Sequence, residues 1–226
     1  MKKGVYKLIV LLFFALTAIH FVPNRSPIAL FWIIKNKVEK KDALNWIIGK
    51  KGEVIYSGDA VRTGQESFAL VKFTDASTLR VGPNAEVVVY GENKPSSTHV
   101  GGGDVSFDIQ KKKEERFEFT TPTSVASIRG TKGLLSVHTD GEDFLTIIKG
   151  LVVFTNNTSK KSVEVKDGET GESKRDGSIF VRPSTQDELK KYMSMNEQVE
   201  IKQHRLEFKY EDKEGKTHKL MIEYEE

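Results

Sequence analysis

Four aspartates offer the clearest chance of ligand chemistry in this chain: Asp59, Asp75, Asp104 and Asp143. Carboxylate oxygens are the ligands that calcium prefers in proteins, so a calcium or other ligand site built from these residues is one hypothesis. Their spacing, however, matches neither an EF-hand loop nor a calcium-binding nonapeptide repeat. We therefore expect these aspartates to be solvated or turn-forming residues, with the ligand site as the alternative.

Other catalytic and metal-binding chemistry has little support. Beyond the N-terminal segment the histidines are single and scattered, so we expect no zinc site and no cofactor; they are His99, His138, His204 and His218. The chain has no cysteine, which excludes disulfides, a thiol nucleophile and a cysteine-linked lipid anchor. No G-x-S-x-G, H-E-x-x-H or P-loop motif occurs. The sequence therefore favours a protein without enzymatic activity, and an envelope enzyme is the less favoured alternative.

The stretch from Thr120 to Val137, TTPTSVASIRGTKGLLSV, carries the densest structural signals and indicates what the chain is built around. Pro122 restricts Thr121 to an extended conformation, and an alternating strand follows. Gly130 and Gly133 then allow a sharp bend or a close backbone approach. The stretch predicts a turn, a strand, a glycine kink and a second strand.

Short β-type runs separated by glycine-containing turns fill residues 45–182. Turn signals recur about every 8 to 12 residues, which is typical of an all-β sandwich, barrel or solenoid. The runs Val87–Tyr90 and Leu145–Ile148 are apolar on both faces and predict central strands. The segment Lys94–Asp104 is rich in proline, serine and glycine and predicts a flexible loop.

The first 22 residues predict a membrane segment. Lys2, Lys3 and Lys7 precede the apolar run Leu8–Val22, and with its flanking residues the span reaches about 18 residues, close to the ~20 that a bilayer needs. A cleaved signal peptide is the alternative, although the residues around Ala18 fit the small-x-small cleavage rule poorly. The lysines favour a single-pass inner-membrane protein with a cytoplasmic N-terminus and the bulk of the chain in the periplasm, or a secreted protein if the segment is cleaved.

Residues 23–44 predict a juxtamembrane linker. The apolar run Ile28–Ile34 is too short to cross a bilayer. It is either an interfacial segment with Trp32 at headgroup depth, or a first strand or helix packed on the domain. The charged stretch Lys35–Asp42 is expected to be solvated.

Residues 183–226 predict a short helix followed by a β-hairpin. Thr185 and Glu188 have the spacing of a capping box, and Leu189, Tyr192 and Met193 mark one helix face. The hairpin carries an apolar stripe that the chain itself or a partner must cover: Leu206, Phe208, Tyr210, Leu220, Ile222 and Tyr224.

Five segments stand in a characteristic order between Gly49 and Gly177: GEVIYSGDAVRTGQESFALVKFTDASTLRVGPNAEV, GGGDVSFDI, FEFTTPTSVASIRGTKGLLSV, FLTIIKGLVVF and VKDGETG. This ordered set resembles the FecR domain, the extracytoplasmic module of a family of envelope sensors and regulators. The resemblance implies a mainly β, solenoid-like or sandwich-like domain outside the inner membrane. Its motif residues here are Gly58, Asp59, Val61, Thr63, Gly64, Ser67, Asp75, Ser77, Thr121, Pro122, Arg129, Gly130, Thr131 and Gly150.

These motif residues have the chemistry of turns and strand starts, so we expect structural roles. Asp59 can cap its own turn, and the hydroxyls of Ser67 and Ser77 can satisfy backbone groups. Arg129 is expected to be an exposed strand residue, with a ligand-binding arginine as the alternative. The family usually has Asp-Gly-Ser where this chain has Asp-Ala-Ser, so Ala76 predicts a turn without a positive φ.

Family members that control sigma factors carry a cytoplasmic anti-sigma region before the membrane segment, whereas only about seven residues precede Leu8 here. We therefore expect no direct binding to a sigma factor. The net charge of +3 comes from 35 basic and 32 acidic residues that are scattered, which argues against nucleic acid. The favoured function is a non-catalytic, membrane-anchored module that binds another envelope or membrane protein, or a glycan, in sensing or regulation. A passive structural or tethering element is the alternative.

Overall fold

The computed structural model describes residues 27–42, 45–91, 96–111, 116–197, 203–211 and 217–225. The membrane segment that the sequence predicts in residues 1–22 lies outside this range. Among the described residues, no helix is both long enough and apolar enough to cross a membrane. The C-terminal hairpin is described by its backbone alone.

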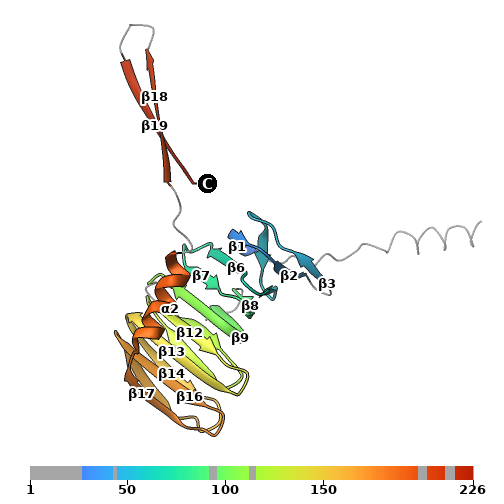
Figure 1. Ribbon diagram of the computed structural model, residues 1–226, viewed down its shortest axis with the longest axis vertical. Coiled ribbons are helices and arrows are strands. Elements are labelled where there is room, and N and C mark those ends of the chain that lie inside the picture. Colours follow the sequence, from blue (N-terminus) through green and yellow to red (C-terminus); the bar gives the residue numbers. More distant parts are fainter. Residues whose placement is uncertain are drawn as a thin grey trace, which may run out of the picture.

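Residues 27–183 form two β-sheets that share strand β9 and enclose one hydrophobic core (Figure 1). Sheet A contains, in spatial order, β4 (Val54–Tyr56), β1 (Pro27–Lys35), β6 (Phe68–Phe73), β7 (Thr78–Val81), β9 (Ser96–Asp108), β12 (Lys132–Val137), β13 (Glu142–Lys149), β16 (Glu169–Lys174) and β17 (Ile179–Pro183). Sheet B contains β3 (Asn45–Ile48), β2 (Val38–Asp42), β5 (Ala60–Thr63), β8 (Glu86–Tyr90), β9, β10 (Phe117–Thr120), β11 (Ser124–Ile128), β14 (Leu151–Asn156) and β15 (Ser162–Lys166). The mainly β fold that the sequence predicts is confirmed.

Strand β9 changes sheets along its length. Its first half pairs with β8 and β10 in sheet B, and from Gly103 onward it pairs with β7 and β12 in sheet A. Gly103 has a φ of 89°, and a Cβ there would lie 2.5 Å from the Cβ of Ala85. The prediction of a flexible loop over Lys94–Asp104 is therefore wrong for residues 96–104, because pairing on both edges outweighs the glycine-rich composition.

Large apolar side chains from both sheets fill the core. The rings of Phe107 on β9 and Phe119 on β10 lie 4.8 Å apart, and both side chains are fully buried. The two runs predicted as central strands lie between neighbours on both sides: β8 between β5 and β9, and β13 between β12 and β16. Their inward residues Val87 and Leu145 are fully buried, as expected for central strands.

Residues 27–42, expected within a linker, instead contribute β1 and β2 to the two sheets. β1 pairs with β4 and β6 and buries Phe31, so this run is a first strand and not an interfacial segment. In the charged stretch that was expected to be solvated, Val38 is fully buried and Lys40 is only 4% exposed. Lys40 tolerates burial because its Nζ lies 2.7 Å from Glu53 Oε1 and donates to the carbonyl of Val54.

The glycine kink predicted after the strand β11 is confirmed. Gly130 has a φ of 68°, and a Cβ there would lie 2.6 Å from the Cβ of Lys111. Gly133 allows a close approach instead, since a Cβ would lie 2.5 Å from the carbonyl oxygen of Thr146. The expectation for Ala76 is wrong, because this residue has a φ of 65° in the tight turn between β6 and β7. The backbone N–H of the following Ser77 donates to Asp75 Oδ1, which helps to hold this turn.

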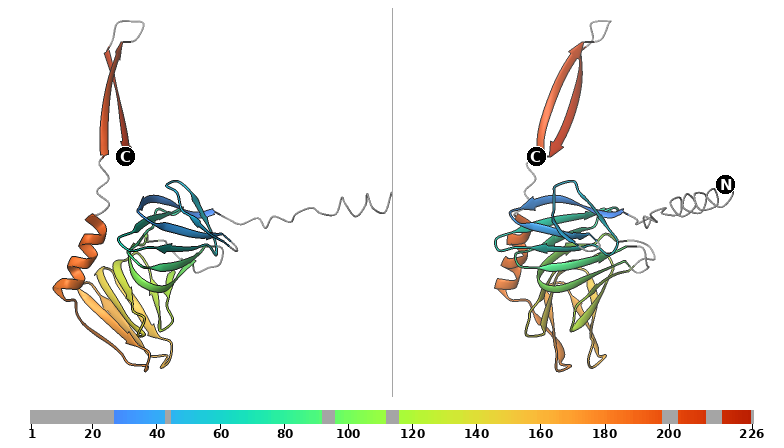
Figure 2. Two further views of the ribbon diagram at one scale, coloured as in Figure 1. Left: turned by 45° about the vertical axis from the view of Figure 1, so that its right-hand side comes forward. Right: turned by 90° about the vertical axis from the view of Figure 1, so that its right-hand side faces the viewer.

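Helix α2 (Gln186–Glu197) lies against the outer face of sheet A (Figure 2). Its predicted capping box is present, because the Thr185 N–H donates to Glu188 Oε2 at 2.7 Å and the Glu188 N–H donates to Thr185 Oγ1 at 3.3 Å. Met195 is buried, whereas Met193, predicted on the packed face, is 55% exposed. The face of α2 that packs on the sheet therefore includes Tyr192 and Met195, which lie one helical turn apart.

The predicted terminal hairpin is present as β18 (Gln203–Glu211) and β19 (Thr217–Glu225). The two strands pair with each other in a separate two-stranded sheet. The register sets Leu206 opposite Ile222 and Phe208 opposite Leu220. The burial of the predicted apolar stripe lies outside the described residues.

Candidate functional site

An open pocket of about 340 Å³ lies on the outer face of sheet B, near its β3 edge. Its lining comes from strands that are far apart in sequence, and the lining residues are Lys41, Trp46, Gly58, Ala60, Glu86, Val88 and Tyr90. The volume is at the lower end of the range typical of ligand sites, about 300 Å³ and above.

The strand register explains the shape of this pocket. Lys41 pairs with both Trp46 and Ala60, and Ala60 pairs with Val88, so four residues form one row across β3, β2, β5 and β8. The small side chain of Ala60 leaves a low floor in the middle of this row. Trp46 stands at the edge of the row, and Tyr90, 41% exposed, follows Val88 on the same face of β8.

Trp46 is held by a charged pair behind the pocket. The guanidinium carbon of Arg62 lies 4.0 Å from the centroid of the Trp46 ring. Arg62 Nε donates to Glu39 Oε2 at 2.8 Å, and this hydrogen bond lowers the pKa of Glu39, so that its carboxylate stays ionised. The pair fixes the guanidinium over the indole ring and thereby orients Trp46.

The pocket has the composition of a recognition site. Two aromatic rings supply apolar contact area, while Lys41 and Glu86 offer one positive and one negative hydrogen-bonding group. Gly58 has a φ of 86°, and a Cβ there would meet no atom within 4 Å, so its turn leaves the pocket rim open. Of the family-motif residues predicted from the sequence, Gly58 is the one among the pocket-lining residues.

The motif residues around β5 serve the backbone. Asp59 is fully buried and accepts a hydrogen bond from the Tyr56 N–H at 2.9 Å, capping its own turn as expected. Thr63 Oγ1 donates to the Gly82 carbonyl at 2.5 Å and accepts from the Ala85 N–H at 3.0 Å. Val61 is fully buried in the core.

Three further motif residues connect neighbouring strands. The Gly64 N–H donates to the Lys37 carbonyl, and Ser67 Oγ accepts a hydrogen bond from the Lys37 N–H at 3.1 Å. Ser77 Oγ accepts from the Gln110 N–H at 3.0 Å. Both serines stand directly before a strand, where the sequence placed them.

Thr121 belongs to a buried polar cluster with Asp143. Thr121 Oγ1 and Ser124 Oγ each lie 2.5 Å from Asp143 Oδ2 and donate to it. Asp143 Oδ1 is buried and has no hydrogen-bond partner among the described residues. Burial raises the pKa of Asp143, although the two hydroxyl hydrogen bonds act in the opposite direction. Pro122, at the turn, is exposed.

The remaining motif residues surround the glycine kink. Gly150 has a φ of 112°, and a Cβ there would lie 2.8 Å from Thr131 Oγ1, so the two segments approach closely. The Gly150 N–H donates to Asp167 Oδ1 at 2.6 Å. Arg129 is exposed, and Thr131 is buried.

The four aspartates considered for calcium have separate partners. Asp104 accepts from Ser136 Oγ and pairs with Lys191 Nζ at 2.7 Å, whereas Asp75 caps its turn. In the part of the chain that the structure describes, no three histidine, aspartate or glutamate side chains come together as a metal site. His99 is in contact with Thr120, and His138 packs against Phe144.

Sequence reasoning missed the pocket residues. Lys41, Trp46 and Tyr90 looked like parts of a linker or of ordinary strands, and their meeting depends on four-strand pairing. The available signal was the presence of Trp46 and Tyr90 in short strands that also carry charged residues. Nothing in their local spacing joins them.

Comparisons with known proteins agree with this fold. A family model described as FecR protein matches residues 59–169. Two crystal structures of a candidate anti-sigma factor from Parabacteroides distasonis ATCC 8503 share the fold, each with a TM-score of 0.53 and 10% sequence identity. The matches cover 66% and 69% of this chain and 66% and 70% of the solved chains. No curated protein matches the chain. Residues 59–169 therefore form a FecR domain.

Proposed function

We propose that this chain is a regulatory, non-enzymatic module of the cell envelope that binds a protein partner through the Trp46 pocket. The observation that carries the proposal is the meeting of Trp46, Arg62 and Tyr90 around one open pocket. Tryptophan, tyrosine and arginine are the residue types enriched in the few positions that dominate protein–protein affinity. The FecR domain supports a role in sensing or regulation.

The chemistry of the pocket favours binding over catalysis. Among the described residues that line it, the ionisable groups are Lys41, Glu86 and the phenol of Tyr90, and none is a histidine. A general acid–base reaction needs a base within hydrogen-bond reach of the proton that it removes, usually with a pKa near neutrality. A pocket of opposite charges and aromatic rings is suited instead to the side chains of a partner protein, and a glycan is the second candidate.

The location in this proposal comes from the sequence. The apolar run Leu8–Val22 anchors the chain in the inner membrane, with the β domain on the extracytoplasmic side. The partner is then another envelope or membrane protein. Similar structures described as candidate anti-sigma factors are consistent with a regulatory protein partner.

The proposal is tested by crosslinking the full-length chain in intact cells and identifying the captured protein. Trp46→Ala and Tyr90→Ala are expected to abolish capture of a protein that wild type retains. Phe180→Ala is the matched control, because Phe180 is an aromatic residue of similar exposure, 43%, on the far edge of sheet A. Equal capture by all three variants contradicts the proposal. Loss of a bound envelope glycan, with protein capture unchanged, favours the second candidate.

A further inference from the structure

Helix α2 covers only part of the outer face of sheet A. Lys191 Nζ lies 2.7 Å from Asp104 Oδ1, and Asn196 Nδ2 donates to Ser106 Oγ, so the helix lies over β9. Figure 2 shows β1 and β6 beyond the end of this helix, toward the β4 edge of sheet A. The outer face of sheet A therefore continues past the residues that α2 covers.

This remaining part of the face carries a group of apolar side chains beside two cations, Lys72 and Arg80. Leu30 pairs with Lys72, and Ile33 pairs with Leu70, which places these residues on the face opposite the core residue Val71. Leu30, Trp32 and Ile33 are partly exposed. Lys72 Nζ lies 4.2 Å from the Trp32 ring centroid, so Trp32 belongs to the same face. Leu70, on the same face, is only 3% exposed and is already buried. We call the partly exposed residues Leu30, Trp32 and Ile33 the β1 patch.

The C-terminal hairpin has an apolar face that requires a packing partner. Its register sets Leu206 opposite Ile222 and Phe208 opposite Leu220, which gathers apolar residues of both strands on one face. An isolated two-stranded hairpin is marginally stable in water, and an apolar face of this size requires cover. β18 and β1 both contain nine residues, so the hairpin matches β1 in length.

The chain between α2 and the hairpin is long enough to bring the two together. One row of paired residues crosses β9, β7, β6 and β1, and its members are Ser106, Arg80, Leu70 and Ile33. Three strand spacings, or ~14 Å, separate the two ends of this row. Asn196 contacts Ser106 at the start of this row. The six residue steps from Glu197 to Gln203 can span up to ~20 Å when extended.

We propose that the β18–β19 hairpin docks with its apolar face on the β1 patch, continuing the layer that α2 begins over sheet A. Two strands then cover two strands at the ~10 Å separation of packed sheets. The docking surface is distinct from the Trp46 pocket, which lies on sheet B. The contact joins the C-terminal end of the chain to the strand that directly follows the N-terminal segment.

The two tryptophans of the chain provide a direct test. In the full-length chain in lipid nanodiscs, Trp46→Phe leaves Trp32 as the sole fluorescent reporter. The double substitution Phe208→Ser and Leu220→Ser is expected to shift the Trp32 emission to longer wavelength and to increase its quenching by acrylamide. Lys209→Ser with Lys219→Ser, a pair on the other hairpin face, is the control and is expected to leave both unchanged.

A second reporter separates docking from misfolding. In a Trp32→Phe background, Trp46 on sheet B reports the folded domain, and neither hairpin variant is expected to alter its emission. Unchanged Trp32 emission in the apolar-face variant overturns the proposal. A Trp32 shift that depends on protein concentration also overturns it, because a second copy then supplies the hairpin. A shift that follows lipid composition but not the hairpin substitutions assigns the patch to the membrane surface instead.

Discussion

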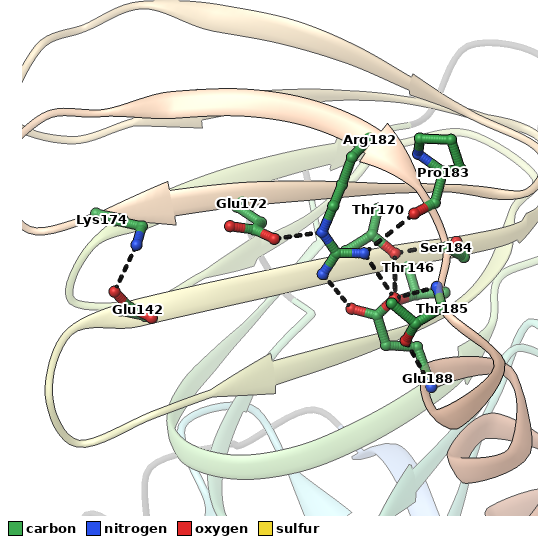
Figure 3. A network of polar contacts seen from close by, with 10 residues as sticks. All are labelled: Glu142, Thr146, Thr170, Glu172, Lys174, Arg182, Pro183, Ser184, Thr185 and Glu188. Atoms are coloured by element: carbon green, nitrogen blue, oxygen red, sulfur yellow. Dashed lines mark hydrogen bonds and ion pairs between the residues drawn. The ribbon is translucent and has the colours of Figure 1, made fainter.

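The guanidinium of Arg182 holds Glu188 through two hydrogen bonds, with Nη1 2.9 Å from Oε2 and Nη2 2.7 Å from Oε1 (Figure 3). Arg182 Nε also donates to Glu172 on β16. Burial raises the pKa of Glu188, but the hydrogen bonds from Arg182 and Thr185 outweigh that effect and lower the pKa to about 2. One arginine on β17 thus joins two strands to helix α2.

This arrangement predicts a pH-dependent contribution to stability from Glu188. Because the folded pKa is about 2 against an ordinary value of 4.5, the contribution is fully present above pH 4.5 and is lost as the pH falls toward 2. At neutral pH, Glu188→Gln is expected to lower the free energy of unfolding by about 1–3 kcal/mol, since the pair borders solvent. Urea unfolding of the wild type and of the variant measures this loss of unfolding free energy. Asp187→Asn, whose side chain is 96% exposed, is the control and should have little effect; equal losses contradict the prediction.

Gly130→Val is expected to destabilise the domain by more than about 1 kcal/mol, because the kink needs a positive φ and the new side chain collides with Lys111. Gly168→Val separates the two causes, since Gly168 has a φ of 77° but open space around it. Thermal unfolding should show a larger loss at Gly130 than at Gly168. Similar losses would mean that backbone strain alone matters.

Arg129→Ala is expected to change the free energy of unfolding by less than about 0.5 kcal/mol, because Arg129 is exposed at the end of β11. Denaturant unfolding of Arg129→Ala and of Gly130→Val compares the changes in unfolding free energy at two neighbouring positions of one motif. A loss above 1 kcal/mol would assign Arg129 a structural role.

Asp143 predicts the opposite pH dependence from Glu188. Burial raises its folded pKa above the ordinary 3.8, so the folded state binds the proton more tightly and wild type gains stability as the pH falls through the folded pKa. Asp143→Asn lacks this titration, so the stability of wild type relative to the variant should rise on acidification. Asp176→Asn is a control of opposite sign, because hydrogen bonds from Ser178 lower the pKa of Asp176. A pH-independent difference at Asp143 contradicts the prediction.

The proposed orientation predicts that a protease added to spheroplasts digests the β domain. Lys2, Lys3 and Lys7 before a single apolar run motivate this expectation. A cytoplasmic protein in the same cells should survive until the membrane is permeabilised. Protection of the whole chain in intact spheroplasts would show that the domain is not outside.

Features set by neighbouring residues could be predicted from the sequence. The capping box of Thr185 and Glu188 and the kink at Gly130 depend on three or four adjacent positions, and both are present. Ala76 shows the limit of local rules, since a tight turn between paired strands imposed a positive φ on a residue that normally avoids it.

Features set by distant partners could not be predicted. Lys40 is buried because Glu53 and the Val54 carbonyl compensate its charge, and neither partner is visible in a charged run. Trp46 on β3 and Tyr90 on β8 line one pocket only because β2 and β5 pair between these two strands. The sequence identified the strands, but pairing decided which of their outward faces became a site.

Both sheets depend on strand β9 for their continuity. Its first half lies inside sheet B and its second half inside sheet A, so each sheet is divided into two parts without it. Loss of this strand removes hydrogen-bonding partners from β8, β10, β7 and β12 together. A single proteolytic cut within β9 should therefore unravel both halves of the sandwich in one cooperative step, whereas a cut in an edge strand such as β15 or β17 leaves most of the molecule intact.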